Sequence, residues 1–290
     1  MGKRVRELAD SLTPIAAQQG IDLQTFLAEA NTKRTEQRRR LAERLQESIA
    51  PLFIGDEQGR PDRIGSCILV RLDSDFFAFT AAHVLRDAEF SELWIPSEGK
   101  GGTLSPLPWN RAGTSPPGAD DLDVGVLILR ASALDPFHQR VFLTGAEIDE
   151  EDQPDDHGSA SFYFVLGYSA SRTQVRVSCA TGGIGQASFH CATGEVEPAE
   201  YAQENISQSD HVLLDFDHKE VSIGGQHPPK LQGVSGGGIF RVSRDTMRGP
   251  LVAVATKNRQ RSCLLIGTRL KHFLAAAREL KATSPPEMFR

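Results

Sequence analysis

The chain has 290 residues, of which 39% are hydrophobic and 24% charged, and its formal net charge is −6. This length and composition fit one or two globular domains with a substantial buried core. The excess of acidic groups argues against nucleic acid as the main partner, because phosphate binding needs a surplus of Lys and Arg.

No part of the sequence has the apolar length of a membrane helix, for which about 18 consecutive apolar residues are needed. The run Met1–Asp10 sets charge beside charge and contains no apolar core of a signal peptide. The sequence therefore predicts a cytoplasmic protein with no membrane partner.

The four cysteines form no CxxC pair: Cys67, Cys179, Cys191 and Cys263. In a reducing compartment we expect them to be free thiols. A metal site at His190-Cys191 is not favoured, because adjacent ligands suit a tetrahedral ion poorly. We predict no metal and no cofactor.

Residues 1–55 are predicted to form a helical extension. Thr13-Pro14 offers a capping hydroxyl and a proline at the first helical position, and Gly20 is typical of a helix end. Asp22 can cap a second helix, and a third is expected over residues 34–49, where Leu41, Leu45 and Ile49 stand four residues apart.

From about residue 62 the hydrophobic pattern changes to that of short strands. The first predicted group of strands covers residues 66–72, 76–80, 92–95 and 124–129, with a loop over 97–121. The second group covers residues 162–166, 174–178, 211–216, 238–242, 251–255 and 263–268, and a helix follows over about 269–281.

Many short strands with turns rich in Gly and Pro predict an all-β fold. An acidic stretch over residues 147–158 separates the strands into two groups of similar size. We therefore predict two β-barrels, one over about 62–145 and one over about 158–270, within a domain spanning residues 56–290.

Three segments place reactive side chains at the ends of predicted strands. His83 follows an apolar strand in the run Thr80–Val84. Asp123 opens the apolar strand that begins at Val124. Ser235 lies in the glycine-rich run Gly233-Val234-Ser235-Gly236-Gly237.

These motifs, in this order, resemble those of the chymotrypsin family of serine proteases, and more closely its bacterial branch. Asp123 follows His83 by 40 residues, which suits that family, and Ser235 follows Asp123 by 112, which implies an insertion. The run Phe164–Tyr168 also resembles the strand that opens the family's second barrel. The resemblance covers about residues 62–281 and implies two six-stranded antiparallel barrels.

The resemblance also implies a serine endopeptidase that acts on a protein or peptide through an acyl-enzyme. Ser235 would be the nucleophile, His83 the general base, and Asp123 the group that orients the imidazole. The backbone N–H groups of Gly233 and Ser235 would form the oxyanion hole.

The sequence departs from the family at several positions. Val234 replaces the Asp that pairs with a newly cut N-terminus in secreted members, so that activation switch is not expected. Val84 replaces a common cysteine, so the bridge made there is absent. Gly238 stands where proline is common.

The resemblance places the substrate pocket on two segments, which comprise Pro229, Lys230, Leu231, Gln232, Ala255, Thr256 and Lys257. Neither segment contains an acid, so cleavage after Arg or Lys is not supported. Lys230 or Lys257 could favour an acidic side chain, although solvated surface lysines are the more common case.

The role of the helical extension remains open between two alternatives. The run Leu12–Phe26 resembles a helix-turn-helix, and Arg38, Arg39 and Arg40 suit DNA. The acidic chain as a whole favours a regulatory partner protein instead. A separate alternative for the whole chain is a catalytically silent binding module on a protease fold.

Overall fold

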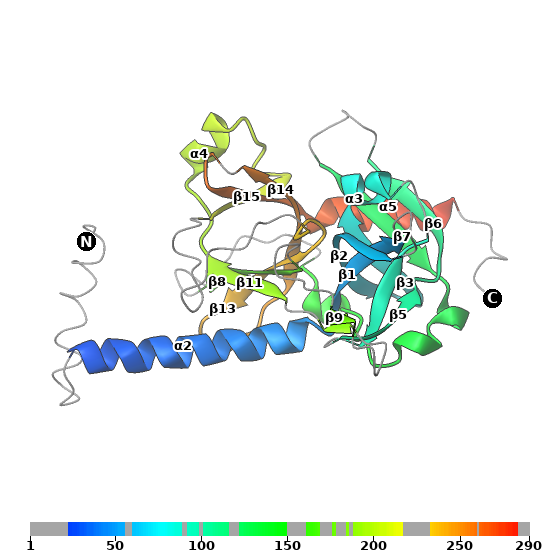
Figure 1. Ribbon diagram of the computed structural model, residues 1–290. Coiled ribbons are helices and arrows are strands. Elements are labelled where there is room, and N and C mark those ends of the chain that lie inside the picture. Colours follow the sequence, from blue (N-terminus) through cyan, green and yellow to red (C-terminus); the bar gives the residue numbers. More distant parts are fainter. Residues whose placement is uncertain are drawn as a thin grey trace. The chain divides into compact units, whose positions relative to one another are not determined.

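The computed structural model describes residues 23–55, 60–88, 92–98, 101–115, 122–149, 161–168, 176–177, 184–185, 188–216, 233–259 and 261–283. The chain divides into two compact units, Met1–Glu43 and Arg44–Arg290. The second unit contains two antiparallel β-sheets, each of them curled (Figure 1).

Most of helix α2 (Leu23–Leu45) belongs to the first unit. It is one continuous helix where the sequence predicts two, because residues 31–33 include neither Gly nor Pro to end it. Arg39 and Arg40 donate to Glu36 on the same helix, each at 2.8 Å. The first predicted helix, over Thr13–Gly20, lies outside the described residues. None of the helices described has the length and apolar character needed to cross a membrane.

The first sheet has seven strands in the order β5-β4-β1-β2-β3-β7-β6. Its strands are β1 (Ile49–Gly55), β2 (Pro61–Leu72), β3 (Asp75–Ala81), β4 (Trp94–Glu98), β5 (Gly101–Pro106), β6 (Trp109–Thr114) and β7 (Val124–Leu129). Every residue of β7 is buried, which explains its unbroken apolar sequence.

The second sheet has six strands in the order β11-β8-β13-β14-β15-β12. Its strands are β8 (Ser161–Gly167), β11 (Phe189–Thr193), β12 (His211–Asp215), β13 (Gly238–Ser243), β14 (Leu251–Arg259) and β15 (Leu264–Arg269). A separate pair joins β9 (Arg176–Val177) to β10 (Ile184–Gly185).

The helices of the second unit are short except for the last. They are α3 (Ala82–Asp87), α4 (Pro198–Gln203), α5 (Leu270–Ala282) and the 3₁₀ turns η1 (Ala131–Ala133), η2 (Asp135–Phe137) and η3 (Gly145–Glu147). Helix α5 follows the second sheet in sequence but packs on the first, where the rings of Phe273 and Phe79 lie 5.6 Å apart. Helix α5 thereby connects the two sheets (Figure 1).

The structure confirms a mostly β architecture with two antiparallel sheets and a C-terminal helix. The second sheet has the six strands expected, whereas the first has seven. Each strand order begins and ends on different strands, so the described residues show no closed barrel.

Two predictions about local structure are wrong. Residues 97–121 do not form only a loop, because β5 and β6 pair with β4 and β7. The helical extension does not reach residue 55, because α2 ends at Leu45 and β1 pairs with β2. Ile49 therefore begins a strand instead of ending a helix, because burial in the sheet outweighs its helical spacing.

Candidate active site

His83 lies where β3 passes into helix α3. Its neighbours Ala82 and Val84 are fully buried, whereas 37% of the His83 side chain is exposed. The small residues of this run allow the strand to turn directly into a helix, and the imidazole is left at the surface.

Asp123 holds both the backbone and the ring of His83. Its Oδ1 accepts from the backbone N–H of His83 at 2.9 Å, and its Oδ2 lies 2.6 Å from Nδ1 of the ring. The backbone carbonyl of Asp123 accepts from the N–H of Ala82. Asp123 has φ 52°, an uncommon value for a residue with a side chain, and only 7% of its side chain is exposed.

Arg86 is a third group at this carboxylate, and the sequence interpretation missed it. Its guanidinium lies 3.5 Å from Oδ1 of Asp123 and donates to the carbonyl of Ser115 at 3.2 Å. The signal available in the sequence is spacing, because residues three apart share one face of a helix, as Arg86 and His83 do on α3.

Ser235 is the partly exposed residue of an otherwise buried loop. Gly233 and Gly236 have φ 89° and 85°, which glycine adopts without strain. A Cβ on Gly236 would lie 1.9 Å from the carbonyl oxygen of Ser66. The glycine motif therefore reflects both backbone conformation and close contact with β2.

The hydroxyl of Ser235 donates to the carbonyl of Thr256 at 3.5 Å. No hydrogen bond joins Ser235 to His83 in the part of the chain that the structure describes. Nε2 of His83 likewise has no partner among those residues. The structure thus brings His83 and Asp123 into direct contact, whereas the Ser235 hydroxyl is turned toward β14.

Two contacts nevertheless bring the Ser235 loop close to the other two residues. A Cβ on Gly65 would lie 2.8 Å from the side chain of Val84 and 3.1 Å from the carbonyl of Ser235. On the Asp123 side, Thr268 of β15 donates to the carbonyl of Leu122, and its hydroxyl lies 3.4 Å from that of Thr256. All three candidate residues therefore lie where the two sheets meet.

The backbone N–H groups of Gly233 and Ser235 have no acceptor among the described residues. The N–H of Gly237 donates to the carbonyl of Val234 at 2.8 Å. Because a trans peptide directs its N–H opposite to its C=O, this bond turns the N–H of Ser235 away from the loop's own backbone.

The predicted substrate pocket is only partly described. Pro229, Lys230, Leu231 and Gln232 lie outside the described residues. Ala255 and Thr256 of β14 are buried, and Ala255 packs in the core of the second sheet. The side chain of Lys257 is partly exposed.

A second group of serine, histidine and aspartate lies near the start of α5. Ser207 donates to Oδ2 of Asp210 at 2.6 Å, and Nε2 of His272 lies 2.9 Å from Oδ1. Here the carboxylate stands between the hydroxyl and the imidazole. The imidazole therefore does not contact the hydroxyl as a general base must, and we do not regard this group as a catalytic site.

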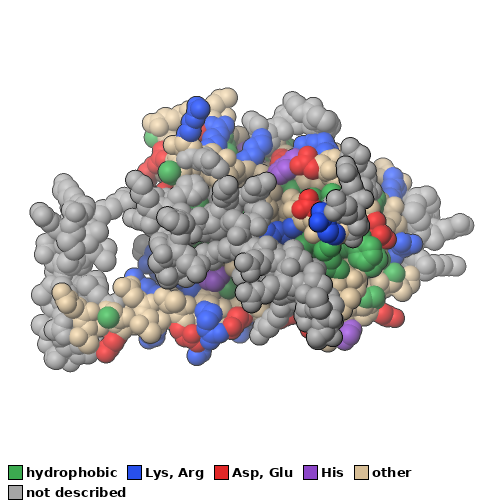
Figure 2. Space-filling view, in the orientation of Figure 1, with side chains coloured by type: hydrophobic (Ala, Val, Ile, Leu, Met, Phe, Trp, Pro, Cys, Tyr) green, Lys and Arg blue, Asp and Glu red, His purple; other side chains and the backbone are tan. Residues whose placement is uncertain are grey.

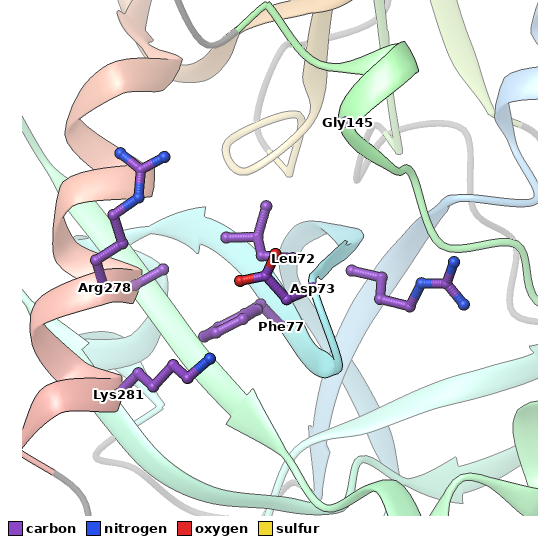
Figure 3. A pocket seen from close by; sticks show the side chains of 8 residues that line it. Leu72, Asp73, Phe77, Gly145, Arg278 and Lys281 are labelled. Carbon is purple, nitrogen blue, oxygen red and sulfur yellow. The ribbon is translucent and has the colours of Figure 1, made fainter.

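A cavity of about 300 Å³ lies between α5 and the β2–β3 turn (Figure 3). Leu72, Asp73, Arg278 and Lys281 are among its lining residues, and none of the three candidate catalytic residues is. Lys281 pairs with Asp75 at 2.5 Å. The cavity is therefore separate from the candidate site.

The described residues contain no cluster of three or more His, Cys, Asp or Glu that could hold a metal ion. Cys67, Cys191 and Cys263 form no disulfide, and Cys179 lies outside the described residues. Lys and Arg side chains are interspersed with Asp and Glu on the face shown in Figure 2. That face therefore presents no continuous basic surface among the residues described.

Comparisons with protein-family models and with curated proteins give no match to this chain. A functional assignment therefore rests on the residues and geometry described above.

Proposed function

We propose that this chain is a serine endopeptidase of the chymotrypsin type, in which each curled sheet represents one of the family's two six-stranded barrels. Its substrate would be a protein or peptide inside the cell, and neither a metal nor a cofactor would take part. The observation that carries the proposal is the contact of Asp123 with both the backbone and the ring of His83.

This contact supports a general base at His83. A carboxylate only accepts hydrogen bonds, so Nδ1 of His83 carries the proton of the 2.6 Å bond. In the neutral imidazole Nε2 is then the basic nitrogen. Since Nε2 has no partner among the described residues, it is available to take the proton of a serine hydroxyl.

Ser235 would use that base to attack a peptide carbonyl. His83 accepts the hydroxyl proton as the Ser235 Oγ–carbon bond forms, and a tetrahedral oxyanion results. The N–H groups of Gly233 and Ser235 would stabilise the oxyanion. His83 then returns the proton to the leaving amine as the peptide bond breaks, and water releases the acyl group by the same sequence of steps.

The reaction requires the hydroxyl of Ser235 to leave Thr256. The 3.5 Å bond between them is at the limit of hydrogen bonding, so its loss costs little. Rotation about one side-chain torsion redirects the hydroxyl without moving the backbone. Catalytic hydrogen bonds are often long or misaligned before substrate binds.

Labelling with a fluorophosphonate tests the proposal directly, because the reagent reacts with activated serines. We expect the wild type to be labelled and Ser235→Ala not to be. Ser207→Ala is the matched control, since Ser207 lies in the second serine–histidine–aspartate group. It should be labelled like the wild type. Labelling of Ser235→Ala equal to that of the wild type would overturn the proposal.

A binding module without catalytic activity is the alternative. The bond from Ser235 to Thr256 favours it, because the hydroxyl is not directed at His83. A wild type that resists labelling and cleaves nothing in a broad peptide library would support this alternative. Activity lost only in Ser235→Ala would exclude it.

A further inference from the structure

Ser66 of β2 is a buried residue that joins the Ser235 loop to the first sheet. Its accessible surface is 0%, although it carries a hydroxyl. The hydroxyl donates to the carbonyl of Gly233 at 2.9 Å and accepts from the N–H of Tyr168 at 3.0 Å. A buried hydroxyl is costly unless it is hydrogen-bonded, and this one is bonded as both donor and acceptor.

The backbone of Ser66 makes two more contacts around the same loop. Its N–H donates to the carbonyl of Ser235 at 2.8 Å. Its carbonyl accepts from the hydroxyl of Thr80 at 2.7 Å. Thr80 lies on β3, three residues before His83. One residue therefore connects the strand that leads to His83 with the loop that carries Ser235.

On the basis of the proposed function, we propose that Ser66 is a positioning residue for the nucleophile. Three consecutive carbonyls of the loop are hydrogen-bonded. Gly233 O accepts from the hydroxyl of Ser66, and Val234 O accepts from the N–H of Gly237. Ser235 O is held by the N–H of Ser66, and the N–H of Gly236 donates to Ala255.

These bonds fix the peptide planes on both sides of Ser235. Rotation of either plane would redirect the N–H of Ser235 and the Cα–Cβ bond that carries its hydroxyl. The hydroxyl of Ser66 holds the plane that precedes these two, between Gly233 and Val234, from across the sheet interface. Its loss would leave Gly233 O and the N–H of Tyr168 buried without these partners, so the first part of the loop would be less constrained.

A role in overall stability alone makes a different prediction from a positioning role. A stability role would change the melting temperature and leave the reactivity of the folded protein intact. A positioning role loosens the loop and slows the chemical step while reagent binding is retained. Ser66→Ala removes only the hydroxyl, and the backbone contacts to Ser235 and Thr80 are kept.

Hydrogen exchange resolved over residues 233–239 tests the proposal without requiring activity. In Ser66→Ala we expect exchange in this segment to rise by about tenfold or more, because the opening of the loop is no longer opposed by a buried bond. Exchange in β7 of the first sheet, which pairs with β3 and β6, should stay unchanged. Ser48→Ala is the matched control, since Ser48 is also a buried serine and directly precedes β1 of the first sheet.

The rate of fluorophosphonate labelling supplies the second measurement. Ser66→Ala should lower the maximal labelling rate by about 10²-fold, comparable to losing one oxyanion donor, with little change in the half-saturating concentration. Ser66→Thr keeps a hydroxyl and should recover most of the rate. Ser66→Cys, in which a weak thiol donor replaces the hydroxyl, provides a second variant if Ser66→Ala does not fold.

The outcomes separate this proposal from the proposed function. Loop exchange in Ser66→Ala that matches Ser48→Ala would overturn the positioning role, whatever the activity. If Ser66→Ala does not fold, the same result in Ser66→Cys overturns it. Faster loop exchange in a protein whose wild type is never labelled would show that Ser66 holds the loop in place, and it would refute the protease. Faster exchange with slower labelling supports both.

Discussion

Asp123 contacts His83 with both carboxylate oxygens, one at the backbone N–H and one at Nδ1 of the ring. The backbone contact fixes the position of the residue, and the ring contact fixes its tautomer. A side chain held in this way has little freedom to present the wrong nitrogen.

Asp123→Asn should lower kcat by about 10⁴-fold while the protein remains folded, because an amide can hold the imidazole in the wrong tautomer. The measurement is cleavage of a peptide found by library profiling, together with a melting curve. Asp215→Asn is a suitable control, since Asp215 is an exposed residue at the end of β12. A kcat within threefold of the wild type would contradict the assigned role of Asp123.

Arg86→Gln should lower kcat/KM by less than about tenfold. The guanidinium reaches Oδ1 of Asp123 at 3.5 Å, but its side chain is 34% exposed, and ion pairs open to solvent contribute up to about 1 kcal/mol. Arg86→Lys should lie between Gln and the wild type, because lysine keeps the charge without the second bond to Ser115. A loss as large as that of Asp123→Asn would mean that Arg86 acts on the substrate itself.

Gly236→Ala should destabilise the protein by about 3 kcal/mol or more, since a Cβ would lie 1.9 Å from Ser66 O at a φ of 85°. Gly145→Ala is the matched control, because a Cβ there meets nothing within 4 Å and its cost should be within about 0.5 kcal/mol. Urea denaturation of both variants provides the comparison. Equal stability of the two variants would show that the backbone around Gly236 can shift to fit a Cβ at little cost in free energy.

Cys67 should resist iodoacetamide at pH 8 in the folded protein. Burial raises the pKa of its thiol to about 12, so only about one molecule in 10⁴ would carry the reactive thiolate. The more exposed Cys263 should be modified first, and Cys67 only after unfolding in urea. Peptide mass spectrometry distinguishes the two sites, and rapid native modification of Cys67 would show that β2 opens readily.

Asp210 should make a small contribution to stability that disappears in acid. A hydrogen bond from Ser207, with a further one from His272, lowers its pKa to about 2 from 3.8. A lowered folded-state pKa stabilises above the unfolded value, so the contribution is present above about pH 4 and is lost as the pH falls toward 2. Because 33% of the Asp210 side chain is exposed, solvent screens its interactions, and Asp210→Asn should cost under about 1 kcal/mol at pH 6. Denaturation curves should converge near pH 2, and a constant difference would contradict the assignment.

The sequence predicted the strands whose apolar pattern is strong, such as β3 and β7, and the helix α5. It did not predict β5 and β6, because their glycines, prolines and polar residues look like a loop until β4 and β7 provide hydrogen-bond partners. The predicted end of the third helix was wrong for a similar reason. The spacing of Leu41 and Leu45 continues to Ile49, but Ile49 pairs with β2 and begins a strand.

The sequence indicates the candidate catalytic residues because each of them lies in a local motif. His83, Asp123 and Ser235 each stand at a recognisable strand boundary. The contact of Ser66 with Gly233 was not predictable, because it joins residues 167 positions apart and depends on how the two sheets meet. The positive φ of Asp123 was equally hidden, since no glycine marks it. The four residues of the first pocket segment, Pro229–Gln232, stay a prediction.

The link between Ser66 and the Ser235 loop has a consequence for how the chain is made. During synthesis His83, Asp123 and Ser66 leave the ribosome well before Ser235, so the first sheet can form while its partner loop is still missing. On our proposal, a truncated chain that ends before β13 has the base without a nucleophile. A fragment of the second sheet alone has the nucleophile without the residue that orients it. Incomplete chains would then be unable to cut other proteins, and proteolytic capability would arise only in the last stage of folding.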